Sequence, residues 1–126
     1  MGFHAEYTAT EELLDRIGQV ARELKAPVFT HNSETRSEVD NCIKKYGMTP
    51  TQLFASKGIY DFGGGGYHCV YLSDEDMKIF KEKNLWAVTC PASNAKLASG
   101  VADLKKQLDF GKVKKIITDL AKAVGW

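Results

Sequence analysis

The sequence lacks an excess of charge of either sign: 17 lysines and arginines stand against 16 aspartates and glutamates, for a net charge of +1. Domains that bind nucleic acid through its phosphates carry a marked basic patch. The sequence also lacks an apolar run of about 18 residues, the length that a membrane-spanning helix requires. We therefore expect no nucleic-acid partner and no membrane span. The opening residues, MGFHAE, contain no basic or apolar signal-peptide region, and we expect a cytoplasmic protein.

Cysteine is scarce, and its placement excludes two kinds of small domain. Cys42, Cys69 and Cys90 are odd in number and widely spaced, which matches neither a disulfide framework nor a zinc knuckle. Low-complexity sequence is limited to the glycine run at residues 63–66, and no internal repeat occurs. The 126 residues, 44% hydrophobic and 26% charged, are typical of a single soluble globular domain.

Helical and strand-like patterns alternate along the chain. Apolar residues recur at helical spacing up to Leu24, and Pro27 ends that helix. Further helices are predicted near residues 37–45, 50–54 and 74–77, and strands near residues 27–31, 66–71 and 85–89. Strands that alternate with helices pair in parallel through right-handed crossovers. The sequence therefore predicts an α/β fold with a parallel sheet.

Local signals predict where these elements begin. Thr8 and Glu11 have capping-box spacing, which predicts Thr8 as the cap of the first helix. Thr49 and Ser73 are predicted to cap the third and fourth helices. The glycine run lacks the Gly-Lys-Ser/Thr of a phosphate-binding loop and is predicted to be a flexible entry to the next strand. The inward stripe predicted for the first helix is Leu13, Leu14, Ile17, Val20, Ala21 and Leu24.

Polar side chains follow the predicted strands. His31 and Glu34 come after the first strand, His68 lies at the second, and residues 91–94 (PASN) follow the third. Ligands bind at the carboxyl ends of parallel strands, and neighbouring strands lie about 4.8 Å apart. We therefore predict that these groups share one face, with the imidazoles of His31 and His68 within roughly 10 Å of each other. Each of the histidines, His4 included, could alternatively be a packing or surface residue.

Four motifs resemble the amidohydrolase superfamily in order and spacing: HAEYT at 4–8, APVFTHNSET at 26–35, YHCV at 67–70 and PASNAKLASG at 91–100. They are most similar to its nucleoside-deaminase and chlorohydrolase-like branch, which includes methylthioadenosine/S-adenosylhomocysteine deaminases. The resemblance extends from Gly2 to about Ala102. It implies a partial (β/α)8 TIM barrel, in which this chain supplies the region from the fourth strand through the seventh.

The resemblance also implies roles for individual residues. His31 matches a metal ligand, and Glu34 matches the glutamate that carries a proton from the metal-bound water to the leaving amine. His68 matches a histidine that orients or polarises the attacked group, and His4 matches one that contacts the substrate. The implied metal is a divalent ion, usually zinc. The implied substrate is a purine nucleoside or a related amino-heterocycle, whose C–N bond is hydrolysed.

The chain also departs from the family pattern. The His-x-His metal pair is missing, and the first three barrel strands have no counterpart. Asp119 falls where a metal-ligating aspartate follows the eighth strand. However, an apolar stripe with lysines opposite predicts a helix there, in which Asp119 would be solvated. We therefore divide the chain into a barrel segment, residues 1–102, and a divergent amphipathic tail, residues 103–126. The stripe consists of Val113, Ile116, Ile117, Leu120 and Val124.

Two functional hypotheses follow from these matches and departures. The chain is either a hydrolase polypeptide that is active only in a complete barrel, or a non-catalytic folded fragment or interaction module derived from an amidohydrolase. Open sheet edges should make either form self-associate or bind a complementing barrel half. Metal content distinguishes the two, because a catalytic zinc site normally takes about three protein ligands.

Overall fold

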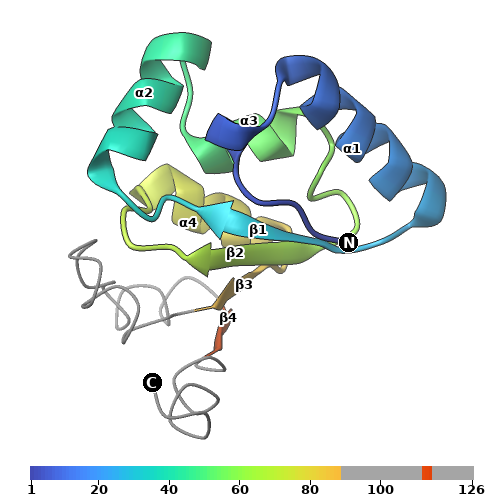
Figure 1. The fold of residues 1–126 in the computed structure, drawn as a ribbon. Coiled ribbons are helices and arrows are strands. Elements are labelled where there is room, and N and C mark those ends of the chain that lie inside the picture. The colour runs from blue at the N-terminus through green and yellow to red at the C-terminus, as the bar shows by residue number, and fades with distance from the viewer. Residues whose placement is uncertain (89–111, 115–126) are drawn as a thin grey trace, which may run out of the picture.

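The computed structural model describes residues 1–88 and 112–114 (Figure 1). In this part of the chain a sheet has the strand order β1-β2-β3-β4, and its pairings are all parallel. The predicted α/β fold, with parallel strands separated by helices, is confirmed. The strands are β1 (Val28–Asn32), β2 (Gly64–His68), β3 (Trp86–Val88) and β4 (Lys112–Lys114). The helices are η1 (Glu6–Thr8), α1 (Glu11–Leu24), α2 (Arg36–Tyr46), α3 (Pro50–Ser56) and α4 (Asp74–Glu82).

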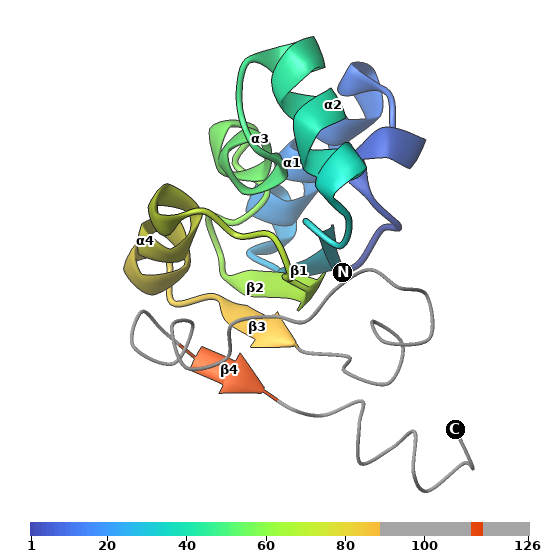
Figure 2. The same ribbon diagram turned by 90° about the vertical axis from the view of Figure 1, so that its left-hand side faces the viewer.

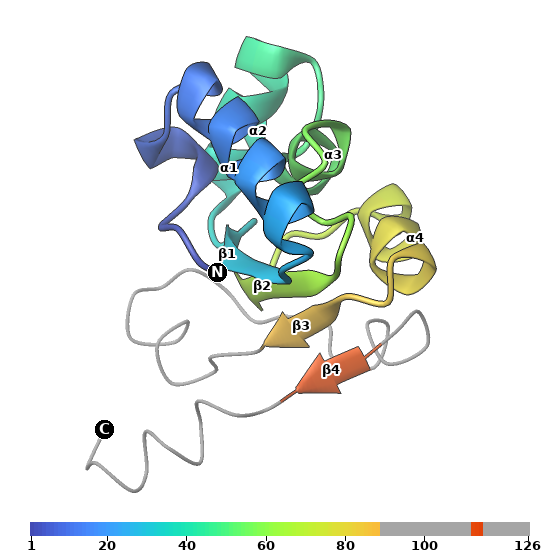
Figure 3. The same ribbon diagram turned by 90° about the vertical axis from the view of Figure 1, so that its right-hand side faces the viewer.

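The helices α1 to α4 lie on one side of the curved sheet, as the two turned views show (Figure 2 and Figure 3). Val28, Thr30 and Asn32 of β1 are fully buried, whereas Phe29 and His31 between them are half-buried. Successive side chains of a strand point to opposite faces, so β1 has one face under the helices and one face turned away from them. This is the arrangement of the wall of a (β/α)8 barrel.

The first residues of the chain continue the sheet beyond β1. An isolated parallel bridge joins Gly2 to Phe29. The backbone N–H of His31 donates to the carbonyl oxygen of His4 at 2.9 Å. The segment therefore lies along the edge of β1 away from β2 and brings His4 to the carboxyl end of that strand.

Helix α1 packs on the core through its glycine. A Cβ on Gly18 would overlap the carbonyl group of Lys57, so only glycine lets the helix backbone come this close. The predicted apolar stripe is wrong at Leu13 and Leu24, which are exposed, because this close approach rotates the packed face away from them. The buried residues of α1 are Leu14, Gly18 and Ala21.

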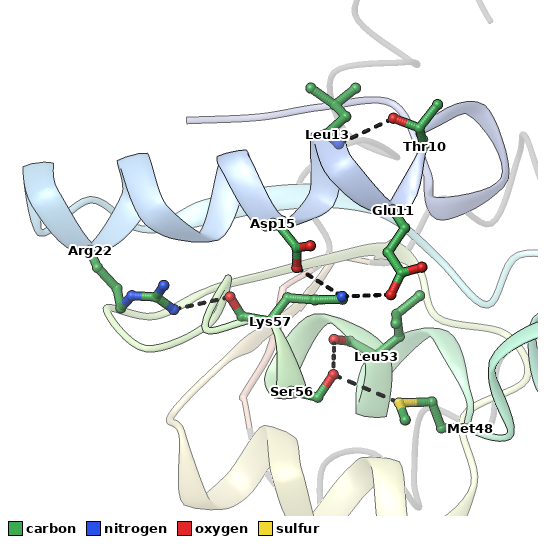
Figure 4. Close-up of polar contacts among 9 residues, drawn as sticks. All are labelled: Thr10, Glu11, Leu13, Asp15, Arg22, Met48, Leu53, Ser56 and Lys57. Carbon is green, nitrogen blue, oxygen red and sulfur yellow. Dashed lines mark hydrogen bonds and ion pairs between the residues drawn. The ribbon is translucent and has the colours of Figure 1, made fainter.

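Lys57, directly after α3, connects that helix to α1 (Figure 4). Its ammonium nitrogen lies 2.8 Å from a carboxylate oxygen of Asp15 and 3.1 Å from one of Glu11. Arg22 donates a hydrogen bond to the carbonyl oxygen of Lys57 at 3.1 Å. The hydrogen bonds to Asp15 and Glu11 raise the pKa of Lys57, so the ammonium stays charged at neutral pH.

Two of the three predicted helix caps are confirmed, and one is wrong. Thr49 and Ser73 each form a capping box at the start of α3 and α4. The N-cap of α1 is Thr10, whose side chain accepts the N–H of Leu13 at 3.1 Å. The hydroxyl of Thr8 instead donates to the carbonyl oxygen that precedes η1, at 3.0 Å. The capping-box prediction fails because Thr8 is already part of this short helical turn.

Gly64 to Gly66 of the glycine run lie inside β2 rather than before it. A Cβ on Gly64 would overlap the backbone of Val28, and a Cβ on Gly65 would overlap the backbone of Trp86. Glycine is therefore needed for the close approach of β2 to both of its neighbours. The prediction of a flexible entry is wrong for residues 64–66, because these residues are paired strand.

Strand β4 lies where the sequence predicts the start of an amphipathic helix. Lys112–Lys114 pair in parallel with Trp86–Val88, and such pairing can override a local helical pattern. The rest of the predicted helix, Asp119 and residues 91–94 lie outside the described residues. Over the ranges 1–88 and 112–114, no helix is long and apolar enough to cross a membrane.

Candidate active site

Three imidazoles meet at the carboxyl ends of β1 and β2. The ring centroid of His31 lies 5.3 Å from that of His68, with the planes stacked at 23°. On its other side, the His31 centroid lies 4.9 Å from that of His4. The prediction that the rings of His31 and His68 lie within roughly 10 Å of each other is confirmed.

His68 reaches this position through an uncommon backbone conformation. The strand register pairs His68 with Asn32 and Tyr67 with His31. Strict alternation would therefore place His68 on the face opposite to His31. Instead, His68 has a φ of 71° and Cys69 a φ of 50°, both in the left-handed region. The chain turns at the end of β2, and the turn lets the ring of His68 stack on that of His31.

The tautomer of His31 follows from its hydrogen bond. Its Nδ1 lies 2.8 Å from the carbonyl oxygen of His4. A carbonyl oxygen can only accept, so Nδ1 carries the proton in the neutral ring and Nε2 keeps a lone pair. A histidine held in this way by a backbone carbonyl has the arrangement typical of a metal-binding histidine.

Glu34 lies beside His68 although the two residues belong to different strand-to-helix loops. Its Oε1 is 3.6 Å from Nε2 of His68, and both side chains are largely buried, with 15% and 7% exposed. Both side chains are of the kinds that act as general acids and bases, and they lie close enough to contact the same bound molecule. The predicted grouping of His31, Glu34 and His68 is therefore present in the structure.

A buried polar network holds the end of β1. The amide nitrogen of Asn32 donates to the hydroxyls of Thr51 at 2.9 Å and Tyr60 at 3.2 Å. The hydroxyl of Ser33 donates to Oδ1 of Asn32 at 2.9 Å. Satisfied buried networks of this kind rigidify the residues that they join. The network therefore supports the backbone from which His31 and Glu34 extend.

Two tyrosines at the site were not identified from the sequence. The ring centroid of Tyr67 lies 5.6 Å from that of His31, and the centroid of Tyr7 lies 5.6 Å from that of His4. Partial burial and the carboxylates of Glu38 and Glu34 raise the pKa of Tyr7, so its hydroxyl stays protonated. Strand alternation could have indicated Tyr67, and the HAEYT motif already contained Tyr7.

The described residues provide part of a metal site at most. Over residues 1–88 and 112–114, no group of three or more His, Cys, Asp or Glu side chains is arranged to hold a metal ion. The free Nε2 of His31 suits zinc as a single ligand. Asp119, the other candidate ligand, is not among the described residues.

A helix-covered parallel sheet with histidines and a glutamate at its carboxyl edge defines a segment of a (β/α)8 barrel with a polar site. The sequence model of the amidohydrolase family matches residues 1–124. The chain therefore belongs to the amidohydrolase family.

Relatives and solved structures agree with this assignment. The chain is 43% identical over 116 residues to the 5-methylthioadenosine/S-adenosylhomocysteine deaminase of Pyrococcus furiosus, covering 92% of this chain and 28% of that protein. It is 42% identical over 110 residues to the 5'-deoxyadenosine deaminase of Methanococcus maripaludis, covering 86% of this chain and 26% of that protein. The chain thus spans about a quarter of the length of these relatives.

Two crystal structures resemble the fold closely. An adenosine deaminase from Xanthomonas campestris with bound zinc has a TM-score of 0.78 at 28% identity, over 90% of this chain and 27% of that one. A guanine deaminase from C. acetobutylicum with bound guanine has a TM-score of 0.79 at 26% identity, over 83% of this chain and 26% of that one.

Proposed function

We propose that this chain is part of a hydrolytic deaminase that acts on an adenosine-type nucleoside or a related amino-heterocycle, and that it works in a complete barrel. The observation that carries the proposal is the convergence of His31, His68 and Glu34, with Glu34 Oε1 at 3.6 Å from His68 Nε2. The substrate class is supported by the relatives, which are named as deaminases of adenosine derivatives.

The proposed metal is zinc, with His31 as a ligand through Nε2 and Asp119 as a further candidate ligand. The zinc in the Xanthomonas campestris adenosine deaminase supports this choice. A bound divalent metal lowers the pKa of water towards neutrality. The hydrogen bond from Nδ1 of His31 to the His4 carbonyl selects the neutral tautomer in which Nε2 has the lone pair for this role. The remaining ligands would come from the other strands of a complete barrel.

The proposed roles of the other residues follow from their chemistry. The carboxylate of Glu34 accepts a proton from the attacking water and donates it to the leaving nitrogen. His68, held against Glu34 and His31, orients or polarises the group under attack. His4, whose ring lies beside His31 and Tyr7, contacts the substrate.

The test combines metal analysis with an adenosine deaminase assay on the purified chain. We expect weak or absent turnover by the isolated chain, because the His-x-His pair is missing. His31→Ala should reduce zinc binding and leave the fold intact. His4→Ala is the matched control, since it removes a neighbouring imidazole but keeps the carbonyl that orients His31. If His31→Ala unfolds the chain without changing its zinc content, the histidine is structural and the proposed metal role is wrong.

A second candidate function is a non-catalytic folded fragment or interaction module. It is compatible with the finding that, over residues 1–88 and 112–114, no group of three or more His, Cys, Asp or Glu side chains is arranged to hold a metal ion. Zinc analysis distinguishes the two: the fragment hypothesis expects no stoichiometric zinc, even after a complementing barrel half is supplied.

We also propose that the chain self-associates or binds a complementing barrel half. Unpaired strand edges are ready to pair with another chain, and a partial barrel cannot close on itself. Light scattering at micromolar concentration tests this, and a sharp monomer peak would contradict it. A reducing cytoplasmic location suits Cys42 and Cys69, which are buried and form no disulfide among the described residues.

A further inference from the structure

The carboxylate of Glu38 makes more hydrogen bonds to the backbone than a helix cap needs. In a capping box, the third residue of the helix accepts the N–H of the N-cap residue. Gln52 does this for Thr49 at 2.9 Å, and Asp76 does it for Ser73 at 3.0 Å. Glu38 also accepts from its N-cap residue, but this is its longest bond, at 3.4 Å.

The two shorter bonds of Glu38 reach the loop before the helix. Its Oε1 accepts the N–H of Ser33 at 3.0 Å, and its Oε2 accepts the N–H of Glu34 at 3.0 Å. The Glu38 side chain comes from the first turn of α2 and is buried, with 6% exposed. One buried carboxylate therefore accepts hydrogen bonds from consecutive backbone N–H groups of the segment that joins β1 to α2.

This segment would not hold its conformation by local preference alone. Ser33 is fully buried and has a φ of 52°, in the left-handed region that serine rarely occupies. Consecutive backbone N–H groups in such a turn form a concave nest for a negative charge. Here the charge comes from the Glu38 side chain, which fixes the direction in which the next residue, Glu34, leaves the backbone.

We propose that Glu38 is a positioning residue, which holds the 33–35 loop so that the Glu34 carboxylate stays beside the imidazole of His68. The inference rests on the proposed function in one respect, namely that Glu34 transfers protons there. Glu38 touches neither reacting atoms nor substrate in this role. It acts only through the backbone N–H groups of the loop.

Glu38→Gln is the informative variant because Gln52 shows that glutamine can complete a capping box in this chain. The amide keeps one acceptor oxygen but replaces the other with an NH2 donor, which cannot accept an N–H. Thr35→Ala is the matched control. It removes the hydroxyl that accepts the Glu38 N–H at 3.2 Å and so weakens the helix cap, but it leaves the carboxylate on the loop.

The readouts are the nuclear Overhauser contact between the side chains of Glu34 and His68, and the hydrogen-exchange rates of the loop amides, in the metal-free chain. In Glu38→Gln we expect the contact to be lost and the amide that faces the NH2 group, that of Ser33 or that of Glu34, to exchange roughly tenfold faster or more. In Thr35→Ala we expect the contact to persist while the amide of Glu38 exchanges faster. Should Glu38→Gln fail to fold, Glu38→Asp, which keeps the charge on a shorter side chain, carries the same expectation.

Two outcomes would overturn the proposal. One is a Glu34–His68 contact that persists in Glu38→Gln with slow loop exchange. The other is an equal loss of this contact in Thr35→Ala, which would mean that the helix cap and not the loop clamp sets the geometry. Neither readout requires zinc or turnover, so a failure of the deaminase assay or of zinc binding by His31 leaves this test independent.

Discussion

The ring of His68 stacks on that of His31 at 5.3 Å, although the strand register pairs His68 with Asn32. The left-handed turn at His68 and Cys69 makes this possible. The turn allows two residues that alternate in the sheet to face the same small volume. The proposed site therefore depends on a backbone conformation that costs a non-glycine residue roughly 1 kcal/mol.

Replacement of His68 tests this backbone cost. We expect His68→Gly to be more stable than His68→Ala by roughly 0.5–1 kcal/mol, since glycine occupies the left-handed region without strain. Urea denaturation of both variants measures the difference. The control is Gln19, an exposed residue of α1, where glycine should be less stable than alanine by a similar amount. If the glycine variant is less stable than the alanine variant at both positions, the result would contradict a strained turn at His68.

Gly65→Ala should destabilise the chain strongly, by roughly 3 kcal/mol, because its Cβ would overlap the backbone of Trp86. Gly63→Ala is the comparison within the same glycine run. Gly63 has a φ of 89° and no neighbour within 4 Å of an added Cβ, so only the conformational cost of about 1 kcal/mol applies. Chemical denaturation measures both, and equal losses would argue against close strand packing as the reason for the run.

The stability of the chain should depend on the ionisation of Glu6. Burial, and secondly the charge of Glu38, raise the pKa of Glu6 from 4.5 to about 7, while a backbone hydrogen bond and Lys45 oppose the shift. Glu6 is 4% exposed, and its Oε2 has no hydrogen-bond partner among the described residues.

The folded state therefore binds a proton more tightly at Glu6 than the unfolded state does. Below pH 4.5 the carboxyl is mostly protonated in both states, and the contribution to stability is fully present. It is lost as the pH rises through about 7. Glu6→Gln should remove this dependence and be more stable than the parent chain by roughly 2 kcal/mol at pH 8. Parallel stability curves for the two proteins between pH 4 and pH 8 would rule the effect out.

Lys57→Met should weaken the attachment of α3 to α1. It removes the ion pairs with Asp15 and Glu11, whose side chains are 60% and 64% exposed. Exposed pairs contribute little each, so we expect a loss of roughly 1 kcal/mol in the free energy of unfolding. The loss measured by urea denaturation should shrink in about 1 M salt, where exposed charges are screened. A loss that is independent of salt would assign the effect to packing of the lysine stem.

The sequence by itself determined the succession of elements. Short apolar runs bounded by helical patterns predicted β1, β2 and β3, and the parallel pairing followed from their alternation with helices. Thr49 and Ser73 were identified as caps because a cap depends on residues within one helical turn. The approach of His31 and His68 also followed, since parallel strand ends meet at one edge of a sheet.

The tertiary structure decided what depends on distant segments. The packed face of α1 was set by contact of Gly18 with the Lys57 carbonyl, and the glycines of β2 were required by its two neighbours. Strand β4 forms because β3 provides a neighbouring strand with which it can pair. Neither a local hydrophobic periodicity nor a helix-cap motif predicts such contacts, because their energy comes from chain segments that are far apart in the sequence. The stacking of His68 on His31 likewise needed a turn whose strain only the folded structure could stabilise.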